Sequence, residues 1–166
     1  TRLKPGDKVH VEGPFGSSYL RERHRGPIVA IAGGSGLAPI KSIVETALAK
    51  ALPQPIHLYF GVRDERDLYP EDHVRALAAR HPSLTFIPVL SEPSGATLRR
   101  TGFVHEAVAS DFGDLDGCKA YLAGPPVMVE AATRMLVTRD TRREDIHADA
   151  FYTEAEKAAN QPRVPE

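Results

Sequence analysis

The chain has 166 residues, a length that fits one domain with a single core. It is 42% hydrophobic and 26% charged, and 21 Lys and Arg against 22 Asp and Glu give a net charge of −1, which offers no electrostatic argument for nucleic acid or an anionic membrane. No apolar run approaches the roughly 18 residues that span a bilayer, and the N-terminus, which lacks both Met and a signal peptide, is expected to belong to a cleaved or truncated piece.

The first predicted element is a half-buried antiparallel strand over residues 7–13, where polar and apolar residues alternate. Glycine, proline and serine at 14–18 end this strand. The polar and basic stretch 21–27 is typical of a connecting loop.

From residue 27 onward, apolar runs of strand length alternate with helical patterns. The predicted strands cover 28–32, 56–60, 84–90, 119–123 and 146–151, and the predicted helices lie around 40–51, 74–81, 104–109 and 127–137. The strands lack clean alternation, as expected when both faces of a parallel sheet are covered. This order predicts an α/β fold, a doubly wound domain with a five-stranded parallel sheet. The polar tail after residue 152 has at most a short exposed helix over 153–162.

An apolar strand, a glycine cluster and a helix start follow one another in residues 28–40. Gly34, Ser35, Gly36 and Pro39 form the pattern G-x-G-x-x-P. A helix start attracts phosphate, and glycines let the backbone approach it, so we expect Gly34 and Gly36 to contact the pyrophosphate of a dinucleotide. Ser35 would either bind the phosphate or nicotinamide end or cap the helix, and Pro39 suits the first helical turn. A glycine-rich turn without a ligand remains an alternative.

Two other glycine-containing loops do not fit this segment. A P-loop needs Gly directly before Lys, and Lys41 follows Ile40. A nucleophile elbow needs a second Gly where Leu37 stands. The usual dinucleotide fingerprint also differs, because it ends in Gly or Ala and places an acid at the end of the second strand, whereas acids here begin at Asp64.

A second turn of the same kind follows the predicted strand 119–123. Gly124, Pro125 and Pro126 lead there into a helical pattern. Ligands of doubly wound sheets bind beyond the carboxyl ends of the strands, where the strand order reverses, so the two turns could face one crevice. By itself, Gly-Pro-Pro is equally typical of a structural turn.

Metal chemistry has little support in the sequence. Cys118 is the only cysteine, so the chain can form no intrachain disulfide and cannot supply the roughly four thiolates of an iron–sulfur cluster. The seven histidines show no ligand spacing. We expect no metal site within this chain.

Taken together, the motifs resemble the ferredoxin–NADP reductase-like family of flavoprotein oxidoreductases, and look most like the reductase components of bacterial aromatic-ring dioxygenases. The matching motifs are G-D-x-V-x-V-x-G-P-x-G at 6–16, G-G-S-G-L-A-P at 33–39, Y-F-G-V-R-x-x-x-D-L at 59–68, G-P-P-x-M at 124–128 and D-A-F-Y at 149–152. The resemblance implies a Rossmann-like NAD(P)-binding domain over 27–152. It also implies that 1–26 hold the end of a truncated FAD-binding β-barrel with a linker, and that 153–166 form a polar tail.

The resemblance further implies roles at the nicotinamide end. Gly124, Pro125 and Pro126 would form the floor under the nicotinamide ribose and ring. Met128 would pack there rather than take part in the chemistry. Phe151 would stack near the flavin ring, where the nicotinamide must displace or pass it, or would be a core aromatic at a strand end.

The residues after the second strand would meet the adenosine end. Arg63 could bind a 2′-phosphate, whereas Asp67 or Glu65 could accept hydrogen bonds from the ribose hydroxyls. Relatives selective for NADP usually have Ser before this Arg, and here Val62 stands there, which favours NADH while leaving NADPH possible. A solvated charged loop is the alternative.

By resemblance, the function is that of an NAD(P)H-dependent flavoprotein reductase in the cytoplasm. Hydride would pass to an FAD held in the full-length protein, and single electrons to a ferredoxin or [2Fe–2S] domain and on to an oxygenase component. The [2Fe–2S] cluster would lie in a missing domain or a separate partner. A nucleotide-binding module without turnover is the rival. A subunit like that paired with dihydroorotate dehydrogenase is disfavoured, because no cysteine cluster lies near the C-terminus.

Overall fold

The computed structural model describes residues 3–13, 18–69 and 71–152. Its centre is a six-stranded parallel sheet with the strand order β4-β3-β2-β1-β5-β6. The strands are β1 Ile28–Gly33, β2 Ile56–Val62, β3 Leu84–Leu90, β4 Arg100–Thr101, β5 Lys119–Gly124 and β6 Ile146–Ala150. The helices are α1 Leu37–Ala49, α2 Glu71–Arg80, α3 Val104–Asp111 and α4 Pro126–Thr138, with short 3-10 turns η1 Gly34–Gly36, η2 Glu65–Asp67 and η3 Arg143–Asp145.

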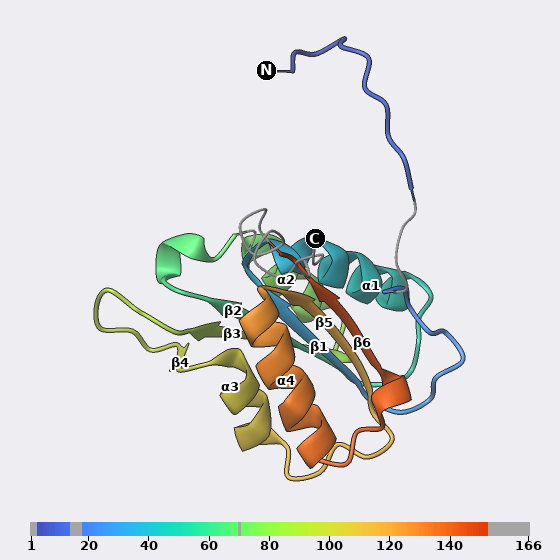
Figure 1. Ribbon diagram of the computed structural model, residues 1–166, viewed down its shortest axis with the longest axis vertical. Coiled ribbons are helices and arrows are strands. Elements are labelled where there is room, and N and C mark those ends of the chain that lie inside the picture. The colour runs from blue at the N-terminus through green and yellow to red at the C-terminus, as the bar shows by residue number, and fades with distance from the viewer. Residues whose placement is uncertain (1–2, 14–17, 70, 153–166) are drawn as a thin grey trace, which may run out of the picture.

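Helices cover both faces of the sheet, with α1 and α2 on one side and α3 and α4 on the other (Figure 1). Every residue of β1 is buried. Ala30 and Ala32 join the core under α1, whereas Val29 and Ile31 join the core under α3 and α4. This two-sided burial explains why the strand sequences are almost continuously apolar, and it confirms the predicted doubly wound fold.

The strand order reverses between β1 and β5. The chain runs from β1 outward through β2, β3 and β4, then returns to pair β5 with the other edge of β1. The pairs Gly33 with Gly61 and Ala32 with Ala123 bring the carboxyl ends of β2, β1 and β5 side by side. The segments that follow these strands therefore meet at one edge of the sheet.

The sheet differs from the prediction by one strand. All five predicted strands and four predicted helices are present, but β4 is a sixth, two-residue strand paired with Val89 and Leu90. Two residues carry no hydrophobic period, so the sequence pattern could not indicate it. None of the helices in the described part of the chain has the length and apolarity to cross a bilayer.

The predicted strand over 7–13 is wrong. These residues form no regular structure, and the side chains of Val9 and Val11 are 59% and 83% exposed. A strand needs a neighbour for its backbone hydrogen bonds and a core for its apolar face, and this segment runs away from the sheet (Figure 1). The assignment of 1–26 to a preceding barrel remains a prediction, and the tail helix over 153–162 lies outside the described residues.

Residues 18–26, which precede β1, are held against the sheet. The backbone N–H of Arg21 donates to the Tyr121 hydroxyl at 2.7 Å, and the side-chain amide of Gln54 donates to the carbonyl oxygen of His24 at 2.7 Å. The backbone of Gly26 lies so close to Gly117 that a Cβ atom would overlap its carbonyl oxygen. We call residues 18–26 the strap.

Candidate functional site

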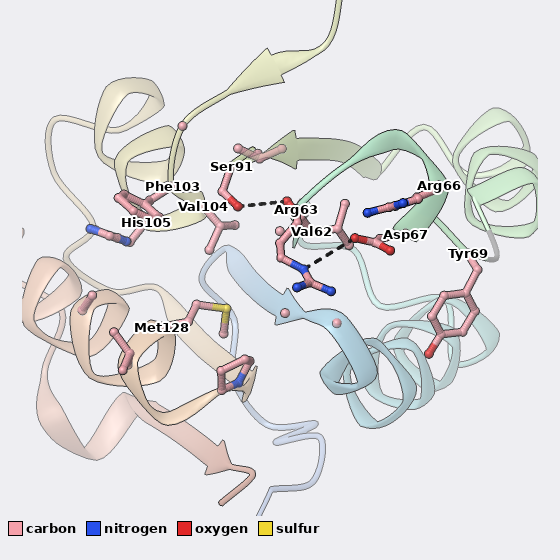
Figure 2. A pocket seen from close by; sticks show the side chains of 18 residues that line it. Val62, Arg63, Arg66, Asp67, Tyr69, Ser91, Phe103, Val104, His105 and Met128 are labelled. Atoms are coloured by element: carbon pink, nitrogen blue, oxygen red, sulfur yellow. Dashed lines mark hydrogen bonds and ion pairs between the residues drawn. The ribbon is translucent and has the colours of Figure 1, made fainter. Parts of the chain in front are cut away.

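A cleft of about 660 Å³ opens at the edge where the carboxyl ends of the strands meet (Figure 2). Its volume falls within the range of small-molecule and cofactor sites. The lining residues come from the ends of β1, β2 and β3 and the segments that follow them, from the residues before and at the start of α3, and from the first half of α4 with the residue before it. They are Gly33, Gly34, Gly61, Val62, Arg63, Arg66, Asp67, Tyr69, Val89, Ser91, Gly102, Phe103, Val104, His105, Pro125, Val127, Met128 and Ala131.

The floor of the cleft is partly backbone because glycines stand at or next to the ends of two lining strands, Gly33 at the end of β1 and Gly61 one residue before the end of β2. A Cβ atom at Gly33 would overlap the Met128 sulfur and lie 3.0 Å from Pro125 Cδ, and a Cβ at Gly61 would lie 2.9 Å from Val104 Cβ. Met128 therefore packs over the end of β1, as expected, and also lines the cleft. Larger residues at these positions would displace the Met128 and Val104 side chains that line the cleft.

The two glycines of the first turn, Gly34 and Gly36, have different surroundings. Gly34 lines the cleft with φ +51°, and a Cβ atom there would have no neighbour within 4 Å. Gly36 is buried and does not line the cleft, because its α-carbon faces β5 and a Cβ would overlap the carbonyl oxygen of Ala123. The close approach at Gly36 thus serves helix–strand packing, whereas Gly34 leaves open space where a ligand would lie.

Ser35 and Pro39 lie outside the cleft lining. Ser35 is exposed in η1, and no side-chain hydrogen bond caps the start of α1, so the capping alternative for Ser35 is not supported. Pro39 lies in the first turn of α1, as expected, and borders a smaller hollow of about 340 Å³ beside Tyr19 and Leu20 of the strap.

The second turn lies directly beside the first. Gly124 has φ +149°, and a Cβ atom there would lie 2.9 Å from the carbonyl oxygen of Gly33. Pro125 lines the cleft, and Pro126 is the first residue of α4, where its missing N–H costs no hydrogen bond. Both turns therefore serve one edge of the cleft, at the point where the strand order reverses.

Arg63 and Asp67 both line the cleft after β2. Arg63 Nε lies 3.8 Å from Asp67 Oδ2, and the Arg63 side chain is 74% exposed. Arg66 is placed similarly, with its Nε 3.8 Å from Asp64 Oδ2. Because the ion pairs are long and both arginine side chains are largely exposed, the pairs hold the guanidinium groups only weakly and leave them available to an anionic ligand.

The two acids next to Arg63 have structural partners. The Asp64 carboxylate accepts the backbone N–H groups of Glu65 at 2.8 Å and Ser94 at 3.2 Å, and the hydrogen bonds from Ser94, with that from Glu65, lower its pKa. Glu65 binds Thr97 and Arg99. Glu65 does not line the cleft, whereas Asp67 does.

The opposite wall contains residues that sequence reasoning missed. Ser91 directly follows β3, Phe103 directly precedes α3, and His105 lies in its first turn, with the rings of Phe103 and His105 stacked at a centroid distance of 5.8 Å. Figure 2 shows this pair facing Arg66, Asp67 and Tyr69 across the opening. Phe103 is 61% exposed, and its backbone N–H donates to Glu106 at 3.0 Å. An aromatic residue directly before a helix, where polar caps are usual, was the signal available in the sequence.

Phe151 lies away from the cleft lining. Its side chain is partly buried against the core under α1, and its N–H donates to the carbonyl oxygen of Gly124 at 2.9 Å. This placement agrees with a core aromatic at a strand end. The stacking role on a flavin remains a prediction.

Cys118 and the histidines form no metal centre in the described segments. No group of three or more His, Cys, Asp or Glu residues there is arranged to hold a metal ion. Cys118 is buried directly before β5, at the opposite end of that strand from the cleft, and burial raises the pKa of its thiol. A buried thiol of this kind is unreactive.

Known proteins share this architecture. Residues 30–134 match the family described as the oxidoreductase NAD-binding domain. The chain is 45% identical over 150 residues to the ferredoxin–NAD(P)+ reductase component of the naphthalene 1,2-dioxygenase/salicylate 5-hydroxylase systems of a Ralstonia species, covering 90% of the chain and 46% of that protein. Identity to the corresponding naphthalene 1,2-dioxygenase system component of Pseudomonas putida is 41%, with the same coverage.

Solved structures agree with these sequence matches. The Amycolatopsis cytochrome P450 reductase GcoB superposes with a TM-score of 0.79 at 38% identity, covering 84% of this chain and 42% of that one. A ferredoxin reductase in carbazole 1,9a-dioxygenase gives a TM-score of 0.74 at 30% identity, again over 84% and 42%. The chain spans about half the length of the curated relatives that it matches.

Proposed function

Because this chain belongs to the oxidoreductase NAD-binding domain family, we propose that it is the pyridine-nucleotide-binding part of a longer NAD(P)H-dependent flavoprotein reductase. The observation that carries the proposal is the placement of two glycine turns side by side on the floor of one cleft. The site lies where the strand order of a doubly wound sheet reverses, which is where such folds bind dinucleotides. The relatives at 45% and 41% identity are named as ferredoxin–NAD(P)+ reductase components.

The residues present fit an extended dinucleotide. The open space at Gly34, together with the backbone at the start of α1, would take the pyrophosphate. Pro125 and Met128 would border the nicotinamide half, with Gly124 and Pro126 holding the turn in place. When bound, the nicotinamide supplies a hydride for FAD, and the protein's part is to orient the ring and exclude water.

The part of the cleft between residues 63–69 and Phe103 would take the adenosine half. Phe103 offers an exposed aromatic face for a base, and Arg63 and Arg66 offer positive charge for phosphate. Asp67 lines the same region, and its carboxylate would accept ribose hydroxyls and repel a 2′-phosphate. NADH is therefore the preferred coenzyme in this proposal, and NADPH a weaker one.

The remainder of the proposal concerns parts beyond this chain. The relatives are about twice as long as the chain, and FAD is assigned to the remainder of the protein. Electrons would pass from the flavin to a ferredoxin or [2Fe–2S] domain and on to an oxygenase component, as the names of the relatives suggest. A cytoplasmic location belongs to the same proposal.

Calorimetric titration of the chain with NADH and NADPH tests the binding site. We expect measurable binding of both, with NADH the tighter ligand, and no heat with either coenzyme would contradict the proposal. The redox role needs the longer protein. That protein should carry a yellow flavin that NADH bleaches, whereas a colourless protein that still binds NADH would be a nucleotide-binding module without turnover.

A further inference from the structure

Two loops form opposite walls of the cleft, and one arginine links them. The first wall, residues 63–69, follows β2. The second runs from Ser91, directly after β3, through residues 92–99 and β4, to Phe103. Arg99 stands directly before β4 and reaches across to two glutamates of the first loop and of α2.

The contacts of Arg99 are short and directional. Its Nε donates to Glu65 at 2.6 Å, and its two terminal nitrogens donate to the two carboxylate oxygens of Glu71 at 2.5 and 2.9 Å. The Arg99 and Glu71 side chains are only 24% and 14% exposed. Burial alone would raise the pKa of Glu71, but the hydrogen bonds from Arg99 and Arg75 outweigh it and leave that pKa below its ordinary value. A forked, partly buried pair of this kind holds a fixed geometry.

Other bonds join the same two loops. Thr97 donates its hydroxyl to Glu65 at 2.8 Å, and the backbone N–H of Ser94 donates to Asp64 at 3.2 Å. Nearer the sheet, the N–H of Glu92 donates to the carbonyl oxygen of Arg63 at 2.8 Å. The segment 91–99 has no regular structure of its own, so these cross-links define its course.

The segment after Arg99 carries the exposed aromatic wall. β4 contributes only two residues to the sheet, and Gly102, with φ +110°, leads directly to Phe103. Neither Arg99 nor its two glutamate partners line the cleft. We propose that Arg99, held by Glu65 and Glu71, is a positioning residue that sets the spacing between the Phe103 wall and the Tyr69 wall, and thereby the affinity for the adenosine half of a dinucleotide.

The identity of the ligand in this inference rests on the proposed function, but the clamp itself does not. Arg75 provides a matched control, because it donates to the same Glu71 oxygen at 2.5 Å from within α2. Arg75 spans one turn of a helix and joins no second loop. Replacing either arginine removes one guanidinium from Glu71, and only the Arg99 change releases the walls.

The test compares Arg99→Gln with Arg75→Gln in the full 166-residue chain. The first readout is titration with ADP-ribose, which carries the adenosine half without nicotinamide. The second is hydrogen exchange of the amides at 100–103, among them the Gly102 N–H that donates to the Leu90 carbonyl oxygen at 2.9 Å. If Arg99→Gln does not fold, Arg99→Lys keeps the charge without the fork and is read in the same two ways.

We expect Arg99→Gln to weaken ADP-ribose binding about five- to tenfold, and Arg75→Gln less than about twofold. Exchange at 100–103 should quicken about fivefold or more in the Arg99 variant alone. Equal exchange at 100–103 in the two variants would overturn the clamp, as would equal ADP-ribose affinities. If the unmodified chain bound no ADP-ribose, the proposed function would fail, and the exchange comparison alone would then decide whether the clamp exists.

Discussion

Gly34 and Gly36 stand two residues apart in the same turn, and the structure predicts opposite consequences for replacing them. A methyl group at Gly36 would overlap the carbonyl oxygen of Ala123 and lie 2.7 Å from the backbone nitrogen of Gly124. A methyl group at Gly34 would meet nothing within 4 Å. Gly36→Ala should therefore damage folding, and Gly34→Ala should damage ligand binding.

The magnitudes follow from these distances. Backbone atoms of β5 cannot turn aside as a side chain would, so Gly36→Ala must displace the start of α1, and overpacking of this kind costs about 1–3 kcal/mol. For a chain of this size that loss lowers the melting temperature by about 2–12 °C. Gly34→Ala carries only the strain of a positive φ, about 1 kcal/mol, but its methyl group would occupy the space proposed for the pyrophosphate. Its affinity for NADH should fall at least about tenfold.

Thermal unfolding followed by circular dichroism and calorimetric titration with NADH measure the two effects. We expect Gly36→Ala to have the lower melting temperature and Gly34→Ala the weaker binding. Gly36→Ala melting within about 1 °C of the unmodified chain would refute the packing argument. Unchanged NADH affinity in Gly34→Ala would refute the placement of the pyrophosphate.

Three further predictions concern the cleft walls and the histidines. Phe103→Ala should weaken NADH binding about tenfold through the lost stacking face, whereas Leu98→Ala, which removes a fully exposed side chain outside the cleft lining, should leave it unchanged by calorimetry. Asp67→Asn removes a negative charge from the cleft, so the ratio of NADPH to NADH affinity should rise by about threefold or more, and a fall in that ratio would contradict our account of coenzyme choice. Burial lowers the pKa of His24, His57 and His147 in the folded chain. As the pH falls, these histidines are therefore protonated in the unfolded chain at a higher pH than in the folded chain. Urea unfolding should therefore show stability lost from about pH 6.5 downward, and His147→Gln should flatten that slope.

The long periodic elements could be predicted from the sequence because their burial is regular. β1 and α1 carry enough apolar residues at fixed spacing to reveal both the strand and the helix face. β4 is too short for any period. The alternation over 7–13 is real, but alternation produces a strand only where a neighbouring strand and a core are present.

The candidate site was predictable on one side only. The glycine turns and the Arg63 segment can be identified in the sequence because each has a distinctive composition and directly follows an apolar strand. Ser91 and Phe103 reach the same cleft from a distant part of the sequence, through a loop whose course depends on cross-links such as that of Arg99. Whether a glycine such as Gly36 faces a ligand or a neighbouring strand depends on backbone geometry, which the residue type alone does not reveal.

The contacts of the strap determine where the N-terminal boundary of this domain should be placed when it is expressed alone or fused to another protein. Gln54 is 3% exposed, and its amide N–H and the Tyr121 hydroxyl are both satisfied by strap backbone. A shortened version starting at residue 27, where the strand–helix alternation begins, would deprive both groups of those hydrogen-bond partners. The practical border of the folded piece therefore lies at or before residue 18, some distance upstream of the place where composition suggests it.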